Sequence, residues 1–458
     1  MNANVENIRN KKVLIVGLGK SGIAAAQAMV RLEAEVSIQD SKREEKIDPQ
    51  LLAFLRGKGV TCYFDRVPHD LGRFDMMILS PGVSPELPFI QEAREAGVEI
   101  IGELEIAYRI GSGNYVAITG TNGKTTTTTL VGEIFKNARR KTYVVGNIGV
   151  AVISASLDAE EDAWLVTETS SFQLETTRYF KPAVSAILNL TPDHLNRHHT
   201  MKAYGQAKAK IFANQREDGY LVINYDDKEC FKLAGSCQAK VVPFSRRQQL
   251  PFGAFVKDGQ IVIKNEKGDI IEICGTGELR IIGAHNLENA LAAAAIAYFA
   301  GIEPKVITET LRAFGGVEHR LEYCGQVDGV KYYNDSKGTN IDASVTALKA
   351  IGKNILLIAG GDAKGQIFDE LIESFGGSVK KLILMGRDGH LIREAANRAG
   401  FDSYVCCKDM EDCVRTAAKL SETGDTVLLS PACASWDMYD NFEQRGEHFK
   451  NCVSRLER

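Results

Sequence analysis

The chain has 458 residues, of which 44% are hydrophobic and 25% are charged, values typical of globular proteins. A single hydrophobic core stops growing well below this length, so we expect two to four domains. The 55 basic and 59 acidic residues give a net charge of −4. This balance provides no overall field that would attract nucleic acid or an anionic membrane, so we expect neither as a partner.

The N-terminal residues show no charged segment followed by a long apolar run and therefore predict no signal peptide. The longest apolar stretch, Ala290 to Ile302, is shorter than the roughly 20 residues that span a bilayer. The ten cysteines form no CxxC pair, which favours buried thiols over disulfides or a zinc site. We expect a monomeric cytoplasmic protein.

Short apolar runs alternate with helical patterns along most of the chain, which predicts α/β domains with parallel sheets. The runs that carry the predicted strands are residues 13–17, 36–40, 76–82, 115–120, 163–171, 184–194, 330–335, 354–361, 381–386 and 426–431. Residues 219–277 instead contain short strands with turn signals and predict a hairpin-rich insertion. A long helix is expected from His285 to its closing Gly301.

These patterns predict three α/β domains. We expect residues 1–105 to form a Rossmann-like N-terminal domain, and residues 106–316 to form a central domain with a parallel sheet of the P-loop type and a β-rich portion. Residues 317–458 form a Rossmann-like C-terminal domain.

The first domain carries Gly17-x-Gly19-x-x-Gly22 between a strand and a helix, and Asp40 ends the next strand. This is the full dinucleotide-binding fingerprint, in which the acidic residue meets a ribose hydroxyl. The fingerprint requires only a phosphate at a helix N-terminus, so NAD, FAD and a UDP-sugar all satisfy it. The loop from Ser80 to Pro85 also follows a strand, and its residues fit equally a loop that closes over the same ligand and a plain turn.

The central domain contains the strongest local signal, GTNGKTT at residues 120–126, directly after a strand and before a helix. Glycines let backbone amides face one concavity, while the lysine neutralises phosphate and the threonine hydroxyl reaches Mg²⁺. Glu168 and His194 follow neighbouring strands and are expected near the same phosphates.

In the third domain, polar clusters follow three predicted strands, at residues 334–340, 360–364 and 430–437. Lys, Ser, Thr and Asp side chains at strand ends suit a small zwitterion or one edge of ATP. His319-Arg320, where the second and third domains join, is expected to place a cation on a phosphate.

Eight segments, taken in order, resemble the ATP-dependent Mur ligases of peptidoglycan synthesis: GTNGKTT, ETSSFQLE, TPDHLNRH, HNLEN, EHRLE, NDSKGTN, GGDAKG and SPACASWDMYDNFEQRG. Two of them, SSFQLE and SPACAS...NFEQRG, are most similar to the member that adds D-glutamate to UDP-N-acetylmuramoyl-L-alanine. The resemblance implies that ATP phosphorylates the substrate carboxylate. D-glutamate then attacks the acyl phosphate, so that ADP and phosphate are released.

The resemblance also implies roles for individual residues. Lys124, Lys208, His194 and Arg320 would be catalytic. ATP would contact Gly120, Thr121, Asn122, Gly123, Lys124, Thr125, Thr126, Asn286, Asn289, Arg320, Asp335 and Lys337. Mg²⁺, with Mn²⁺ as an alternative ion, would be held by Thr125, Glu168, His194 and Lys208, the last as a carbamate, since an ammonium would repel the metal.

The same resemblance implies two substrate sites. The UDP-substrate would contact Lys20, Ser21, Gly22, Asp40, Ser41, Lys42, Ser80, Gly82, Asn147 and His194. D-glutamate would contact Thr339, Lys364, Ser435 and Phe442. Trp436 departs from the smaller aliphatic residue expected after Ser435, and Ser41-Lys42 stand where related enzymes often carry Thr-Arg.

Three other functions remain open on the residues alone. An NAD-dependent oxidoreductase would use Gly17 to Gly22 and Asp40 but leaves GTNGKTT and the third domain without a purpose. A P-loop nucleotide switch would turn over ATP or GTP without any carboxylate substrate. A sibling ligase for another amino acid, or a folate polyglutamate synthetase, would share the GTNGKTT-like loop.

Overall fold

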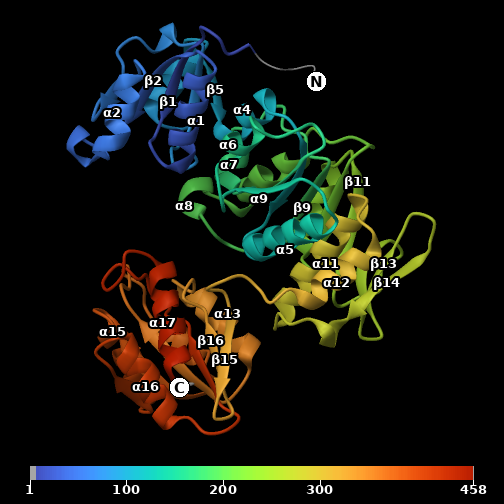
Figure 1. Ribbon diagram of the computed structural model, residues 1–458, viewed down its shortest axis with the longest axis vertical. Helices are drawn as coiled ribbons and strands as arrows, with labels where there is room; N and C mark the ends of the chain where they lie inside the picture. The colour runs from blue at the N-terminus through green and yellow to red at the C-terminus, as the bar shows by residue number, and fades with distance from the viewer. Residues whose placement is uncertain (1–6, 457–458) are drawn as a thin grey trace. The chain divides into compact units, whose positions relative to one another are not determined.

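The computed structural model describes residues 7–456 (Figure 1). It contains three sheets, and its chain divides into two compact units. Of the described residues, the first unit contains 7–278 and 288–312, and the second contains 279–287 and 313–456. The first unit holds a five-stranded and a nine-stranded sheet, and the second a six-stranded sheet. The predicted three-domain α/β fold is therefore confirmed.

The five-stranded sheet is entirely parallel, in the order β3-β2-β1-β4-β5. Its strands are β1 Lys12–Val16, β2 Glu35–Asp40, β3 Thr61–Phe64, β4 Met76–Leu79 and β5 Glu99–Gly102. The accompanying helices are α1 Lys20–Arg31, α2 Pro49–Gly57, α3 Pro88–Glu95 and α4 Glu103–Ile110. Because β1 lies between β2 and β4, the loops after β1 and β4 face each other at the carboxyl edge, where such sheets bind ligands.

The central sheet has the order β14-β13-β12-β11-β10-β9-β6-β8-β7. Its strands are β6 Asn114–Thr119, β7 Thr142–Gly146, β8 Trp164–Glu168, β9 Val184–Ile187, β10 Tyr220–Asn224, β11 Lys240–Ser245, β12 Gly253–Lys257, β13 Gln260–Lys264 and β14 Ile270–Gly275. The helices are α5 Lys124–Asn137, α6 Val152–Ser156, α7 Ser171–Glu175, α8 Leu195–His198, α9 Met201–Ala209, α10 Lys228–Lys232, α11 Ala284–Phe299 and α12 Pro304–Ala313.

The hairpin-rich insertion predicted at 219–277 is only partly present. Strands β10 and β11 are buried and pair in parallel with their neighbours, so they extend the central sheet. Only β12, β13 and β14 form antiparallel hairpins, at the edge of that sheet. The reason is the connection through α10, which provides the crossover that two parallel strands require.

The six-stranded sheet has the order β15-β16-β20-β17-β18-β19, and only β15 and β16 pair antiparallel. Its strands are β15 Glu322–Val327, β16 Val330–Asn334, β17 Ile355–Gly360, β18 Val379–Met385, β19 Tyr404–Cys406 and β20 Thr426–Leu429. The helices are α13 Ile341–Ile351, α14 Asp369–Glu373, α15 Gly389–Arg398, α16 Met410–Leu420 and α17 Phe442–Leu456.

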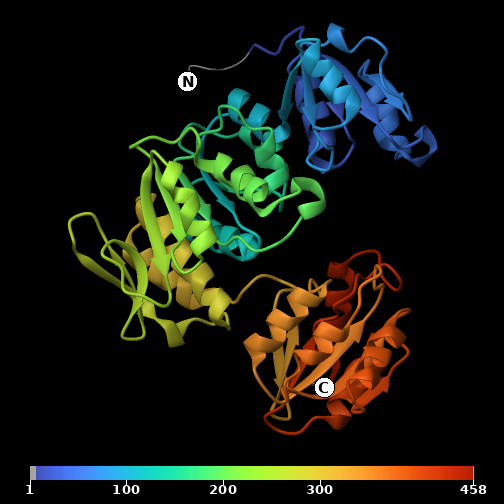
Figure 2. The same ribbon diagram turned by 180° about the vertical axis from the view of Figure 1, so that it is seen from behind.

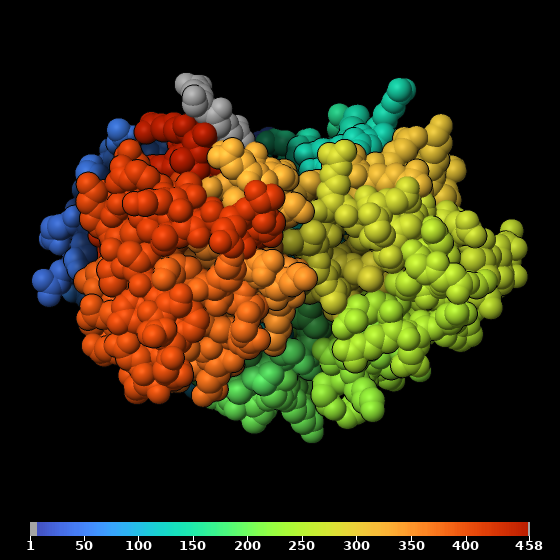
Figure 3. Space-filling model, turned by 90° about the horizontal axis from the view of Figure 1, so that it is seen from below, coloured from blue at the N-terminus to red at the C-terminus, as the bar shows by residue number. Residues whose placement is uncertain are grey.

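Helices lie on both faces of this sheet (Figure 2), and each face has its own hydrophobic core. Leu357 and Leu428 pack with α13, α14 and α15, whereas their neighbours Ile358 and Leu429 pack with α16 and α17. This alternation follows from the two-residue period of a strand, and burial on both faces explains why the strands are apolar throughout. In Figure 3, the residues of the second unit from 313 onward are coloured orange to red and form one continuous surface.

Within the first unit, α4 joins the five-stranded sheet to the central part of the chain. The fully buried Glu105 accepts hydrogen bonds from the Nε of Arg109 and from the backbone N–H groups of Arg178, Tyr179 and Phe180. Four donors compensate the charge that burial would otherwise penalise. The carboxylate therefore fixes the chain between α7 and β9 against α4.

All ten cysteines are free thiols, as predicted, but only five of them are buried; four are half-buried and Cys406 is exposed. No helix among residues 7–456 is long and apolar enough to span a membrane.

Candidate active site

The GTNGKTT loop lies between β6 and α5, as the sequence predicts. Gly123 has a φ of +81°, and a Cβ at this position would lie 2.3 Å from Oδ1 of Asn289, so a glycine is required. Asn189 holds the loop from outside, since its Oδ1 accepts from the N–H of Asn122 at 2.8 Å and its Nδ2 donates to the carbonyl of Asn122 at 3.1 Å. The loop is therefore preformed.

Two lysines contact the carbonyl oxygen of Gly120. Nζ of Lys124 lies 2.9 Å from this oxygen and 2.7 Å from the carbonyl oxygen of Thr121, and Nζ of Lys208 lies 2.9 Å from the oxygen of Gly120. Lys208 is 1% exposed, and its ammonium lies over the ring of Tyr204. Burial, followed by the charge of Lys124, lowers the pKa of Lys208 to about 7.

Glu168 ends β8 and is almost completely buried. Its Oε1 accepts a hydrogen bond from Nδ2 of Asn147 at 2.8 Å, whereas its Oε2 is buried with no hydrogen-bond partner in the described part of the chain. A buried carboxylate oxygen without a donor is costly, and a cation would compensate it. The geometry thus fits the predicted metal role of Glu168.

His194 follows β9 in a left-handed conformation, with a φ of +52°. Its exposed side chain packs against Phe172, with 4.8 Å between the ring centroids, and its Nε2 lies 3.4 Å from Oδ2 of Asp193. The histidine is therefore accessible to a ligand.

Asn289 and Asn286 lie on α11. Asn289 is buried against the phosphate loop, where its Oδ1 accepts from the hydroxyl of Thr127 at 3.3 Å. Nδ2 of Asn286 donates to the carbonyl of Ile282. Asn289 therefore has a role besides its predicted contact with ATP: it packs against the phosphate loop and helps to fix its shape.

The predicted UDP-binding loops meet at the carboxyl edge of the five-stranded sheet. The hydroxyl of Ser80 donates to the carbonyl of Gly17 at 2.7 Å, and a Cβ on Gly22 would lie 1.8 Å from that carbonyl. The carboxylate of Asp40 accepts from the N–H groups of Leu18 and Lys42. Asp40 thus orders two loops. Lys20, Ser41, Lys42 and Gly82 are exposed, and Ser21 is half-buried.

Arg197 joins one of these loops to the segment that carries His194. Its Nη2 donates to the carbonyl of Val83 at 3.0 Å and to Oε2 of Glu175 at 2.7 Å, and its guanidinium lies over the ring of Phe172. No pattern in the sequence indicates this role, because the partners are more than 20 residues away in the chain.

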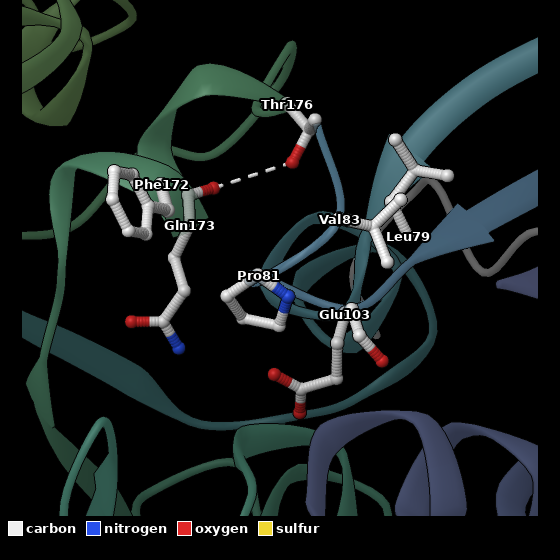
Figure 4. A pocket seen from close by; sticks show the side chains of 9 residues that line it. Leu79, Pro81, Val83, Glu103, Phe172, Gln173 and Thr176 are labelled. Atoms are coloured by element: carbon white, nitrogen blue, oxygen red, sulfur yellow. Dashed lines mark hydrogen bonds between the residues drawn. The ribbon is translucent and has the colours of Figure 1, made fainter. Parts of the chain in front are cut away.

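A small pocket lies between the loop after β4 and α7 (Figure 4). Val83 and Phe172, which contact Arg197, are among the residues that line it. Gln173 and Glu103 flank Pro81 in this view. Glu103 is completely buried, its Oε1 accepts from the N–H of Ile153 at 2.6 Å, and burial raises its pKa to about 7. Glu103 therefore caps α6, which follows the loop that carries Asn147.

This raised pKa predicts a pH-dependent stability. The folded state keeps the proton of Glu103 up to about pH 7, whereas an ordinary carboxyl group releases it near 4.5. Stability from this group is therefore full below pH 4.5 and is lost as the pH rises to 7, by about 3 kcal/mol. We expect Glu103→Gln to flatten the pH dependence of the free energy of unfolding, measured by urea titration across this range.

The exposed Glu95→Gln substitution on α3 is the control for this experiment and should leave the pH profile unchanged. Equal profiles for Glu103→Gln and the parent protein would contradict the assignment.

In the second unit, Asp335 follows β16 and is almost fully buried. Its carboxylate accepts from the hydroxyl of Ser430 at 2.7 Å and from the N–H of Leu321 at 3.3 Å, and burial raises its pKa to about 7. The first of these bonds joins the loops after β16 and β20, and the second fixes the chain beside Arg320.

Of the residues predicted for D-glutamate, Thr339, Lys364 and Ser435 lie on loops of this same unit, and Phe442 is the first residue of α17. The ammonium of Lys337 lies 5.0 Å from the ring centroid of Phe442, and that of Lys364 lies 5.6 Å from the ring of Trp436. Trp436 is 67% exposed, whereas the neighbouring Ser435 is buried. Thr339 precedes α13 by two residues. The indole ring of Trp436, which stands where a smaller aliphatic residue was expected, therefore lies beside Lys364, a residue predicted to bind the amino acid.

Three domain models match consecutive parts of the chain. They are the Mur ligase MurD-like N-terminal domain over residues 11–102, the Mur ligase middle domain over 118–297, and the Mur ligase glutamate ligase domain over 319–433. Together they cover the strands of the three sheets, except for the first four residues of β6.

Known proteins are similar over the full length. The UDP-N-acetylmuramoylalanine--D-glutamate ligase of Thermoanaerobacter sp. (strain X514) is 47% identical over 98% of this chain and 100% of its own. The protein of that name from Clostridioides difficile (strain 630) is 46% identical with the same coverage.

Solved structures support the fold. UDP-N-acetylmuramate-alanine ligase MurC from Thermotoga maritima has a TM-score of 0.58 at 19% identity, over 97% of this chain and 99% of that chain. A pseudomurein peptide ligase type C from Methanothermus fervidus has a TM-score of 0.57 at 17% identity, over 98% and 100%. With matching models for all three domains and full-length relatives at 46–47% identity, the chain belongs to the Mur ligase family.

Proposed function

We propose that this protein is an ATP-dependent ligase that joins D-glutamate to UDP-N-acetylmuramoyl-L-alanine and releases ADP and phosphate. The observation that carries the proposal is the 47% identity, over essentially the whole chain, to a ligase named for this substrate and this amino acid. Because both ATP and a UDP-linked substrate are cytoplasmic metabolites, we place the reaction in the cytoplasm.

Forming an amide from a carboxylate and an amine is uphill in water, so the carboxylate must first be activated. In the proposed reaction, the carboxylate of the UDP-substrate attacks the γ-phosphoryl group of ATP, and ADP leaves. The amine of D-glutamate then displaces phosphate from the acyl phosphate and loses a proton. The protein contributes positioning and charge neutralisation, as is usual for phosphoryl transfer.

Lys124 is the residue we assign to the transferred phosphate. Its ammonium is held at the loop by two carbonyl oxygens, and phosphate oxygens would provide stronger, charge-assisted partners. Backbone amides of residues 120–126 would bind the remaining phosphate oxygens, and the chain near Asn289 would face the adenine. Arg320, Asp335 and Lys337 are the further ATP contacts we propose from the third domain, residues 317–458.

Mg²⁺ bound at this site would neutralise charge on the phosphates. The hydroxyl of Thr125, the unpartnered Oε2 of Glu168 and the accessible imidazole of His194 are the groups we propose to hold it. The oxygen ligands of this set suit either Mg²⁺ or Mn²⁺.

Lys208 completes this set only after modification. Its pKa of about 7 leaves a large share of neutral amine near neutral pH, and a neutral amine adds CO₂ to give a carbamate and a proton. The product is an anion beside Lys124 in place of a second ammonium. This removes the repulsion between two cations that now share the carbonyl of Gly120.

The substrates would bind on separate parts of the chain. We propose that the domain of residues 1–105 binds the UDP moiety through the loops of Ser80, Gly82 and residues 20–22 and 40–42, with Asn147 and His194 of the central domain, residues 106–316, at the reacting end. D-glutamate would take Lys364 as the partner of one carboxylate, with Thr339, Ser435 and Phe442 around it.

The test is ADP release by the purified protein with UDP-N-acetylmuramoyl-L-alanine, ATP and Mg²⁺. We expect release with D-glutamate and none with L-glutamate, L-alanine or L-lysine, or without an amino acid. Release with another acceptor would keep the ligase and reassign the amino acid. ADP release that needs no carboxylate substrate would instead support a nucleotide switch. In a separate assay, a change in absorbance at 340 nm after addition of NADH and candidate ketones would support an oxidoreductase.

A further inference from the structure

Arg445 lies in the first turn of α17, and its side chain is 99% buried beside the loops at the carboxyl edge of the six-stranded sheet. Its Nε donates to the hydroxyl of Ser336 at 3.0 Å and its Nη2 to the carbonyl of Ser336 at 2.8 Å. Both terminal nitrogens donate to the carbonyl of Cys433 at 3.1 Å. One side chain thus makes four hydrogen bonds to two residues that lie more than 90 positions apart.

These partners come from loops that follow neighbouring strands. Ser336 follows β16, Cys433 follows β20, and Gly361 follows β17, whose place in the sheet is beside β20. A Cβ on Gly361 would lie 3.3 Å from Nη1 of Arg445, so the third loop packs closely against the guanidinium. The hydroxyl of Ser336 also donates to the carbonyl of Phe442, which fixes the start of α17 to the same loop.

The three loops carry most of the residues assigned above to the second unit. Asp335, Lys337 and Thr339 flank Ser336, while Ser435 lies two residues after Cys433. Lys364 lies three residues after Gly361. A displacement of the guanidinium would release the loops after β16 and β20, to which it is hydrogen-bonded. The loop after β17 would be disturbed with them, because backbone hydrogen bonds between Asp362 and Ala434 join it to the loop after β20.

The charge of Arg445 is unusual because all four hydrogen bonds are made to neutral oxygen atoms. Among residues 7–456 no carboxylate forms an ion pair with it, and burial lowers its pKa to about 10. Keeping such a charge away from water is costly unless something compensates it. Asp437 and Asp335 act on this charge without forming an ion pair with it, so an anionic substrate at the strand ends would add further compensation.

We propose that Arg445 is a positioning residue: it fixes the loops after β16, β17 and β20 and adds positive potential behind them, so that they bind a dicarboxylate amino acid. This inference rests on the proposed ligase function. Arg445 itself contacts backbone and hydroxyl groups, and it acts on the substrate through Ser435, Lys364 and Thr339.

Arg445→Lys is the variant that tests the proposal, because lysine keeps the charge and the length but cannot make a forked set of hydrogen bonds. We expect the KM for D-glutamate to rise about 10- to 100-fold, the range for losing charged hydrogen bonds, while the KM for the UDP-substrate changes less than about twofold. Amide hydrogen exchange at residues 335–339 and 433–436 should accelerate in the same variant.

Arg455→Lys is the matched control, since Arg455 is exposed near the end of the same helix. It should change neither the kinetics nor the exchange rates. Arg445→Met, which also removes the charge, should raise the KM for D-glutamate further than Arg445→Lys does.

An active parent enzyme with an unchanged KM for D-glutamate in Arg445→Lys would overturn the role of Arg445. Equal losses for all three substrates, together with a lowered melting temperature, would also overturn it in favour of a purely structural role. A parent protein that releases no ADP with D-glutamate would instead contradict the proposed function. These results are distinguishable within one set of assays.

Discussion

Replacing Lys124 with alanine is expected to lower ADP formation about 10³-fold or more, the scale found when one charge on a transferring phosphoryl group is removed. Binding of UDP-N-acetylmuramoyl-L-alanine should remain close to that of the parent protein. Lys124 begins α5, after a strand of the nine-stranded sheet, whereas the loops of Ser80 and Asp40 belong to the five-stranded sheet. ADP release and calorimetric binding of the UDP-substrate measure the two effects separately.

Lys136→Ala is the matched control, because Lys136 is exposed in the last turn of the same helix. It should retain full turnover. If Lys124→Ala turned over at the parent rate, the GTNGKTT loop would have no part in the chemistry. If the variant also lost the UDP-substrate, the substitution would have disturbed the first unit as a whole.

The sequence predicts the fold well where local patterns suffice. The strand–loop–helix around GTNGKTT and the fingerprint after β1 both combine a buried strand, glycines and an amphipathic helix, and the structure contains both elements. The long helix expected between His285 and Gly301 is α11, which runs from Ala284 to Phe299. In each case hydrophobic periodicity and a glycine at the boundary provide the signal.

Strands at sheet edges and in the insertion are less predictable. β15 is half-exposed and β19 has only three residues, so neither provides a buried apolar run. β10 and β11 resemble hairpin strands because the turn signals around them are dense. Their parallel pairing depends on neighbours that are distant in the chain, such as β9, which a local pattern does not reveal.

The same limit applies to the candidate site. Residues 120–126 follow a local motif, but the contact between Lys208 and the carbonyl of Gly120 joins positions 88 residues apart. Without the family resemblance, Lys208 is one lysine on a helix. The sequence places Arg445 in the segment SPACASWDMYDNFEQRG but assigns no role to it or to Glu103. A buried guanidinium and a buried carboxyl group are recognised only when the surrounding loops are in place.

Replacing Lys208 with alanine is expected to lower ligase turnover about 10²-fold or more, as when a ligand or a group that orients a metal is removed. Short carboxylates such as formate, acetate and propionate should restore part of the activity, because the cavity left by the side chain can admit an anion in place of the carbamate. Turnover at a fixed concentration of each acid, with saturating Mg²⁺, ATP and both substrates, is the measurement.

Lys202→Ala provides the control, because Lys202 is exposed on the same helix, α9. The turnover of this variant should equal that of the parent enzyme and should not change when acids are added. The parent enzyme should lose activity in buffer freed of CO₂ and regain it with bicarbonate. Rescue by none of the acids, with no effect of CO₂, would mean that Lys208 acts as an amine or ammonium. Its hydrogen bond to Gly120 would then be its contribution, and the second cation beside Lys124 would belong to the working enzyme.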